Sequence, residues 1–201
     1  MKNKGKKILF LGDKDSPLLQ WLTEQEGSGV VLQTSEKITP GFLLENHIGF
    51  IVSYGYRHII QSDVLGLLPN KVINLHISFL PWNRGADPNL WSFIENTPKG
   101  VTIHYVDEGL DAGDIIVQEE VTLSGNETLA SSYGLLQAAI QDLFKAHWQS
   151  IKSGTCNRIK QQGSGSSHKV KDKEAIAHLL THGWDTPVNQ LVGSGQQENT
   201  Q

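Results

Sequence analysis

The sequence predicts an α/β protein whose sheet is Rossmann-like and mostly parallel, with helices on both faces. The first observation is that short apolar segments alternate with helical segments through the first half of the chain. The second is that these segments are apolar throughout, which is typical of strands buried on both faces. The third is size, because 201 residues with a 38% hydrophobic fraction suit a single core with a small appendage.

The first half of the chain is expected to form four strands and three short helices. Residues 6–12 form a buried strand, and Ser16 and Pro17 then begin a helix that Gly27 ends. The elements that follow, in order, are a strand at 29–34, a helix or turn at 39–47, a strand at 48–54, a helix at 61–69 and a strand at 71–76. This alternation predicts that the strands are parallel and that each crossover between them is right-handed.

The second half has a more mixed pattern. Its longest helical periodicity runs from Leu129 to Ile151, with Asn126 available as the N-cap and Gly154 as the end of the helix. Before this helix, the expected elements are a helix at 87–96 and two strands at 99–107 and 113–121.

The last fifty residues are expected to form a short helical extension. Residues 161–168 are rich in Gly and Ser and predict a flexible connector. Asp172 would then cap a helix over residues 173–182, and residues 192–201 would be frayed. The chain is therefore expected to divide into a main domain at 1–153 and an extension at 154–201.

Composition and charge narrow the class of protein. A net charge of −4 provides no basic field for nucleic acid. The N-terminal apolar run stops at Asp13, which is too short for a signal peptide, and no apolar run is long enough to cross a bilayer. The single cysteine, Cys156, excludes an internal disulfide and a thiolate metal cluster. We therefore expect a cytoplasmic protein with no nucleic-acid or membrane partner.

An amide and an imidazole lie two positions apart in the segment INLHISFLPWNRGADP, residues 73–88. Residues at i and i+2 of a strand project to the same face, so Asn74 and His76 would point together at the carboxyl end of a parallel strand. Open α/β sheets bind their ligands there. Two neighbouring donors could stabilise the oxyanion of an acyl transfer. The alternative is a hydrogen-bonded structural histidine beside a turn-forming asparagine.

The second polar segment is HYVDEGLDAGD, residues 104–114. A metal loop that includes His104 is one interpretation, although the acidic spacing does not match an EF-hand. A solvated hairpin turn would explain Asp107 and Glu108. Asp111 differs because small residues follow it and allow close backbone approach. A carboxylate beside His76 would favour the protonated imidazole, which can donate to an oxyanion and act as a general acid.

These two segments resemble the formyltransferases that use 10-formyltetrahydrofolate. This family includes glycinamide ribonucleotide formyltransferase, methionyl-tRNA formyltransferase and the nucleotide-sugar N-formyltransferases. The resemblance covers most of residues 6–153 and implies the formyltransferase fold, with 1–153 as the catalytic domain. The positions that carry it are Asn74, His76, Ser78, Leu80, Pro81, Gly85, Leu110, Asp111 and Gly113.

The resemblance also implies roles for individual residues. Asn74 would stabilise the tetrahedral intermediate, His76 would be the acid, and Asp111 would keep His76 protonated and help to move the proton of the amine. The co-substrate would be 10-formyltetrahydrofolate, and no metal would be required. The residues expected to form the folate pocket are His58, Ile59 and Ile60 on one wall and Asp107, Glu108, Gly109 and Leu110 on the other.

Among the branches of this family, the sugar enzymes match best. The acidic chain lacks the basic C-terminal domain expected of the tRNA enzyme. The loop at 12–17 contains Asp13 and Asp15, which are unsuited to the phosphate of glycinamide ribonucleotide. Ile77 also replaces the proline that usually follows the motif histidine in that branch. We therefore expect formyl transfer to the primary amine of a nucleotide-linked amino sugar.

Two tryptophans and an arginine are the candidate residues for binding the substrate. Trp82 and Trp91 could stack on a base or sugar, and Arg84 could contact a diphosphate. Equally, Trp91 could belong to the core and Arg84 could brace its loop. His168, in the extension, resembles part of some sugar enzymes but could be connector only. There are two alternative functions. One is formylation of glycinamide ribonucleotide, and the other is non-catalytic binding of folate or a nucleotide sugar. A homodimer is possible.

Overall fold

The computed structural model describes residues 6–196 and contains a six-stranded central sheet. In space the strands run β2-β1-β3-β4-β6-β7. Their bounds are β1 Lys7–Gly12, β2 Val31–Thr34, β3 Ile48–Tyr54, β4 Val72–His76, β6 Gly100–Tyr105 and β7 Ile115–Glu120. The first four strands pair in parallel, whereas β6 is antiparallel to both of its neighbours. The mostly parallel sheet expected from the sequence is confirmed.

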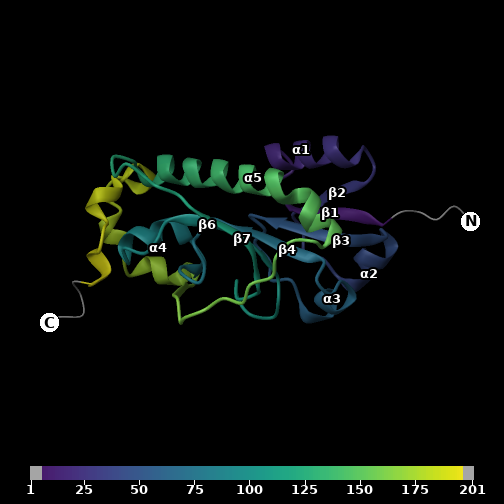
Figure 1. The fold of residues 1–201 in the computed structure, drawn as a ribbon. Coiled ribbons are helices and arrows are strands. Elements are labelled where there is room, and N and C mark those ends of the chain that lie inside the picture. Colours follow the sequence, from purple (N-terminus) through teal and green to yellow (C-terminus); the bar gives the residue numbers. More distant parts are fainter. Residues whose placement is uncertain (1–5, 197–201) are drawn as a thin grey trace, which may run out of the picture.

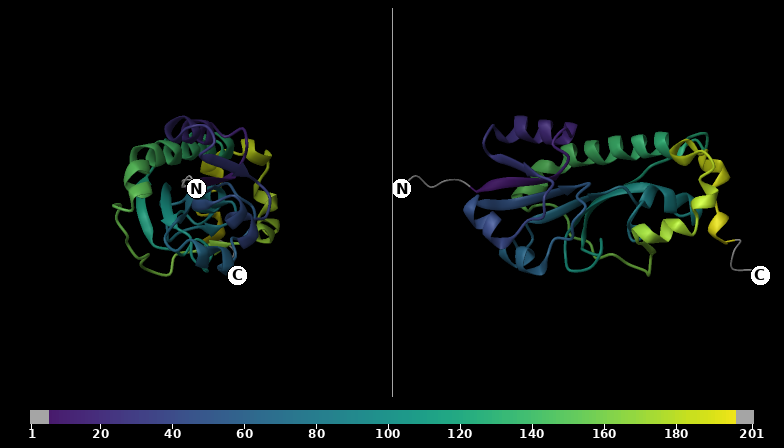
Figure 2. Two further views of the ribbon diagram at one scale, coloured as in Figure 1. Left: turned by 90° about the vertical axis from the view of Figure 1, so that its right-hand side faces the viewer. Right: turned by 180° about the vertical axis from the view of Figure 1, so that it is seen from behind.

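Helices cover both faces of this sheet, as Figure 1 and the views in Figure 2 show. One face packs on α1 and α5 around Phe10, Phe144 and Trp148, and the other packs on α2 and α3 around Leu9, Ile51 and other aliphatic residues. No helix within residues 6–196 is both long and apolar enough to span a membrane. The helix bounds are α1 Pro17–Glu26, α2 Pro40–Glu45, α3 Ser62–Leu67, α4 Pro88–Ile94 and α5 Leu129–Ser153.

Helices α1 and α5 begin and end at capping residues, and one of the expected caps needs correction. Helix α1 begins at Pro17 and is followed by Gly27, as expected. The cap of α5 is Thr128 and not Asn126: Thr128 Oγ1 accepts from the Ser131 amide, and Ser131 Oγ accepts from the Thr128 amide. This reciprocal pair satisfies two orphan amides. Gly154, with φ of 76°, ends the helix.

The expected helix over residues 173–182 is wrong. The chain instead forms short 3₁₀ turns, because only Ile176 in that range is buried and a stripe of so few apolar residues does not sustain an α-helix. Ile176, Val188 and Leu191 pack against α4 as a third apolar cluster. The turns are η1 Val170–Glu174, η2 Ala177–Leu179, η3 Gly183–Asp185, η4 Val188–Gln190 and η5 Ser194–Gln196.

Two other expectations about the extension need correction. The segment expected to be a flexible connector is paired with the core, since β8 (Ser167–His168) forms a parallel ladder with β5 (Arg84–Gly85). Figure 1 shows the chain after α5 running back along the sheet toward α4. The start of the expected frayed tail is also held, because the Gly193 amide donates to the carbonyl of Phe93 at 3.0 Å. The rest of that tail, from residue 197, lies outside the described residues.

Candidate active site

Strand β4 places Asn74 and His76 at the carboxyl end of the parallel part of the sheet. Side chains two positions apart share a face, and both of these side chains face the turn that joins β6 to β7. His76 is buried, whereas Asn74 is partly exposed. The sheet therefore presents an amide and an imidazole to the same point, which is where α/β sheets bind ligands.

Asp111 occupies that point. Its Oδ1 accepts a hydrogen bond from Asn74 Nδ2 at 3.3 Å, and its Oδ2 lies 3.7 Å from His76 Nδ1. The amide of Gly85 donates to Oδ2 at 2.8 Å. Asp111 has φ of 47°, a left-handed conformation that aspartate tolerates better than most residues. Gly113 permits the turn, because a Cβ there would lie 1.8 Å from the carbonyl oxygen of Tyr105.

The electrostatics of Asp111 favour the carboxylate. Burial by itself would raise the pKa of this carboxyl group. The charge interaction with His76, the hydrogen bond and charge of His104, and the Gly85 amide together outweigh burial and hold the pKa well below its usual range. Asp111 is thus an anion that lies between two imidazoles, where it can stabilise a positive charge on either ring.

His104 is the functional candidate whose role the sequence did not reveal. The sequence suggests His104 only as a possible metal ligand. In the structure its Nδ1 bonds the Tyr105 carbonyl at 2.8 Å, and its Nε2 lies 3.3 Å from Asn74 Nδ2 and 3.5 Å from Asp111 Oδ1. His104 is directly opposite Asn74 in the β4–β6 ladder, so a correct strand register would have found it. Within residues 6–196 no group of three or more possible ligands has the arrangement of a metal site.

Asn83 is a second residue that sequence reasoning missed. Its backbone carbonyl accepts a hydrogen bond from His76 Nε2 at 3.1 Å, so the other ring nitrogen, Nδ1, faces Asp111. Asn83 is fully buried, and its side chain accepts from Thr97 Oγ1 at 2.8 Å and donates to Glu95 Oε2 at 3.1 Å. A buried and fully bonded asparagine thus fixes one edge of the imidazole ring.

The residues expected to form the folate pocket differ in exposure. Ile59 is 74% exposed and Leu110 is 51% exposed. Ile60 is buried in the cluster between the sheet and α3, so its side chain belongs to the core. The remaining expected residues, His58, Asp107, Glu108 and Gly109, are exposed. Ile59 and Leu110 are therefore the apolar side chains available to a ligand.

The three residues expected to bind the substrate differ in exposure and in their contacts within the protein. Trp82 is 36% exposed and available for stacking, whereas Trp91 is 7% exposed and one of its faces is covered by His168. Arg84 donates to Gln161 Oε1 through Nε and Nη2, at 3.1 and 2.7 Å, and to the Ser164 carbonyl through Nη1. These contacts favour the alternatives that Trp91 belongs to the core and that Arg84 braces its loop.

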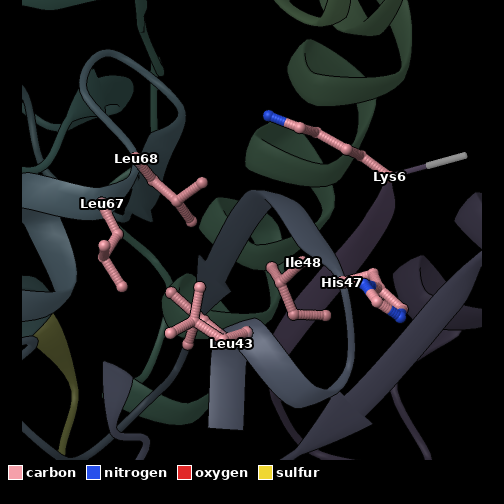
Figure 3. Close-up of a pocket in the computed structure, with 7 residues that line it drawn as sticks. Lys6, Leu43, His47, Ile48, Leu67 and Leu68 are labelled. Atoms are coloured by element: carbon pink, nitrogen blue, oxygen red, sulfur yellow. The ribbon is translucent and has the colours of Figure 1, made fainter. Parts of the chain in front are cut away.

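A separate pocket of about 350 Å³ lies at the opposite edge of the sheet (Figure 3). Lys6, just before β1, and Ile48, the first residue of β3, line it together with His47, and leucines of α2 and of the end of α3 complete it. This position is the wrong end of the parallel strands for a ligand of the Asn74–His76 site.

An amide, two imidazoles and an ionised carboxylate meet at the carboxyl ends of the parallel strands, and such groups can stabilise the oxyanion of an acyl transfer. A protein-family model described as formyl transferase matches residues 24–144, more than half of the chain. The protein therefore belongs to the formyl transferase family.

Two curated relatives are methionyl-tRNA formyltransferases. The protein of Clostridium botulinum (strain Alaska E43 / Type E3) is 29% identical over 184 residues, which are 89% of this chain and 57% of that protein. The protein of Fusobacterium nucleatum subsp. nucleatum is 39% identical over 112 residues, 55% of this chain and 36% of that protein. The chain thus spans about half or less of the length of these relatives.

Two solved structures are also similar to this chain. The formyltransferase PseJ from Anoxybacillus kamchatkensis, in complex with UDP-4,6-dideoxy-4-formamido-L-AltNAc and tetrahydrofolate, is 50% identical with a TM-score of 0.89 and covers 94% of this chain and 100% of that chain. The likely sugar N-formyltransferase Rv3404c from Mycobacterium tuberculosis, 24% identical with a TM-score of 0.74, covers 86% of this chain and 78% of that chain and supports the fold alone.

Proposed function

We propose that this protein transfers the formyl group of 10-formyltetrahydrofolate to the primary amine of a nucleotide-linked amino sugar. The observation that carries the proposal is the convergence of Asn74 and His76 on the carboxylate of Asp111. The choice of acceptor is supported by the 50% identity to PseJ across nearly the whole chain. A UDP-linked 4-amino sugar is therefore the preferred acceptor class.

In this reaction the neutral amine attacks the formyl carbon, and negative charge develops on the formyl oxygen. Asn74 stabilises that charge through its side-chain amide. Its Nδ2 donates to Asp111 Oδ1 at 3.3 Å, and a hydrogen bond of this length is weak and readily exchanged for a charged acceptor. The backbone beneath Asn74 is a central strand, so the donor is held in place before the reaction begins.

The proton transfers fall to the imidazole and the carboxylate. His76 donates a proton as tetrahydrofolate leaves, and Asp111 stabilises the imidazolium form and accepts the proton that the attacking amine loses. Both oxygens of Asp111 are already hydrogen-bonded or close to an imidazole, so the carboxylate keeps one orientation throughout. The new bond joins the amine nitrogen to the formyl carbon, and the bond from that carbon to the folate nitrogen breaks.

The folate itself would bind beside the turn that carries Asp111. Ile59 and Leu110 supply exposed apolar surface for the pteridine ring, and the backbone of residues 58–60 and 107–110 supplies polar groups. Trp82, which is partly exposed, is the aromatic candidate for the nucleotide or sugar face. Arg84 already has three hydrogen bonds within the protein, so we assign it to the loop.

The acceptor can be tested directly with 10-formyltetrahydrofolate and a panel of amines. The panel contains UDP-linked 4-amino sugars, dTDP-linked amino sugars, glycinamide ribonucleotide and methionyl-tRNA, and product is measured by mass spectrometry and by release of tetrahydrofolate. We expect turnover with a nucleotide-linked amino sugar. Turnover confined to glycinamide ribonucleotide or to the tRNA would reject this acceptor, and tight binding of both ligands with no turnover would identify a binding module.

A further inference from the structure

Residues 161–168, which we name the strap, lie against the loop that follows β4. The strap runs beside β5, where the Arg84 amide donates to the Ser166 carbonyl and the Ala86 amide donates to the His168 carbonyl, each at 2.9 Å. The approach at Gly85 is so close that a Cβ there would lie 2.3 Å from the His168 carbonyl oxygen. The match to the family ends at residue 144, so it does not include the strap.

One end of the strap holds the turn that carries Asp111. Gln161 Nε2 donates to the backbone carbonyls of Asp111 and Gly113, both at 2.8 Å. Gln161 Oε1 accepts two hydrogen bonds from Arg84, the neighbour of the residue whose amide binds the Asp111 carboxylate. A single side chain thus ties the Asp111 turn to the loop that supplies a hydrogen bond to its carboxylate.

The other end of the strap holds the residue that contacts His76. Ser166 Oγ accepts from the Asn83 amide at 3.0 Å and donates to Glu95 Oε2 at 2.6 Å. The Asn83 carbonyl is the acceptor for His76 Nε2. Ser166 therefore fixes the backbone at Asn83, which in turn fixes the orientation of the His76 ring.

His168 anchors this end of the strap to the core. Its ring stacks on Trp91 with a centroid separation of 3.8 Å and an interplanar angle of 6°. Its Nε2 lies 2.9 Å from Glu95 Oε1, the second oxygen of the carboxylate that binds Ser166. The strap is consequently attached at both ends and at points between them, and is not a tether between independent parts.

We propose that two residues of the strap position the catalytic groups: Gln161 is the positioning residue for Asp111, and Ser166 is the positioning residue for His76. This inference rests on the proposed formyl transfer. Neither residue needs to touch the reacting atoms, because each acts by limiting the positions of a group that does. Misplacement of a reacting group by about 1 Å can reduce a rate by about 100-fold, so loss of such contacts is measurable.

The strap itself provides matched controls. Gln161→Ala is compared with Gln162→Ala, whose side chain is exposed, and Ser166→Ala is compared with Ser167→Ala, whose side chain is also exposed. We expect kcat to fall about tenfold or more in Gln161→Ala and Ser166→Ala, with KM for both substrates within about twofold of wild type. Both controls should retain wild-type kcat and KM. Thermal unfolding of all four variants shows whether each protein is folded at the assay temperature.

A second measurement does not require turnover. The carboxyl ¹³C resonance of Asp111 is followed during acid titration of wild type, Gln161→Ala and Gln162→Ala. Two imidazoles face this carboxylate, His76 from β4 and His104 from β6, together with the Gly85 amide. Without Gln161 the turn can move away from these partners, and we expect the carboxyl group to titrate at a higher pH than in wild type and in Gln162→Ala.

The two measurements separate the strap from the proposed function. If wild type turns over no amine but the Asp111 titration moves in Gln161→Ala alone, formyl transfer is rejected and the positioning role stands. If wild type is active and Gln161→Ala and Ser166→Ala match their controls in kcat, and the titration does not move, the positioning role is rejected. A kcat loss that is explained entirely by a smaller folded fraction, with an unchanged titration, rejects it too.

Discussion

Asp111 Oδ2 and His76 Nδ1 lie 3.7 Å apart, although one residue belongs to a hairpin turn and the other to a parallel strand. The second nitrogen of His76 bonds the Asn83 carbonyl, and the second oxygen of Asp111 faces His104 and Asn74. Each of the two groups is therefore held on both sides. An acid and its counter-ion with this little freedom need little reorganisation during the reaction.

Asp111→Asn tests the charge of this pair without a change of shape. Asparagine also tolerates the left-handed backbone at this position, so the turn should keep its conformation. We expect kcat to fall about 100-fold or more, because the variant neither stabilises the imidazolium nor accepts a proton. Steady-state kinetics measure this. Asp142→Asn, an exposed carboxylate on α5, is the control, and equal kcat values in the two variants would contradict the role of Asp111.

His76→Ala separates binding from chemistry. The imidazole acts on the reacting centre and not on the pteridine, so we expect the dissociation constant for tetrahydrofolate to change by no more than about threefold while kcat falls about 1,000-fold. Isothermal titration calorimetry and initial rates provide the two numbers. His147→Ala, in α5 and outside the site, should leave both at wild-type values. Near-normal turnover in His76→Ala would require a different acid.

The pKa of Asp111 also makes a prediction about stability. The folded-state pKa lies below the ordinary value of about 3.9, so ionised Asp111 stabilises the folded state above about pH 4, and this contribution is lost as the pH falls toward the folded-state pKa. Urea unfolding of wild type and Asp111→Asn between pH 3 and pH 7 should show a stability difference at neutral pH that shrinks below about pH 4. If the stability difference between the two proteins grows on acidification, the pKa of Asp111 is raised in the folded state and not lowered.

The two tryptophans near the site should respond differently to truncation. Trp91 is buried against His168, so Trp91→Ala should lower the free energy of unfolding by about 3–5 kcal/mol through the cavity that it leaves. Trp82 is partly exposed, so Trp82→Ala should change stability by about 1 kcal/mol or less and raise KM for the acceptor. Chemical denaturation and acceptor kinetics distinguish the two. A raised acceptor KM in a fully folded Trp91→Phe would restore Trp91 as a substrate contact.

The exposed side chains of Ile59 and Leu110 should bind the folate. Ile59→Ser and Leu110→Ser each remove apolar surface that is already in contact with solvent, so stability should change by about 0.5 kcal/mol or less. We expect the affinity for tetrahydrofolate to fall about tenfold in each, as measured by calorimetry. Leu44→Ser is the matched control, because Leu44 is 64% exposed but lines the pocket near the amino ends of β1 and β3. An equal loss of tetrahydrofolate affinity in all three variants would argue against a folate site at Ile59 and Leu110.

Much of the fold could be predicted because its elements are encoded locally. The strands β1 and β3 are mostly apolar, and Pro17, Gly27 and Gly154 mark helix ends through backbone preferences that do not depend on distant residues. The sequence alone predicts the α5 cap two residues too early, because Asn126 and Thr128 are both good caps. Only the Ser131 partner decides between them.

The sequence by itself determined the order of the elements and the motif of Asn74, His76 and Asp111, because hydrophobic periodicity and turn chemistry act over a few residues. Tertiary structure decided the position of His104, which depends on the register of β4 with β6, and the conformation of the extension, which follows the surface of α4. It also decided the role of Gln161, which bonds Arg84 across 77 positions of the chain. Contacts between segments so far apart leave no local pattern, because each partner alone is an ordinary polar residue.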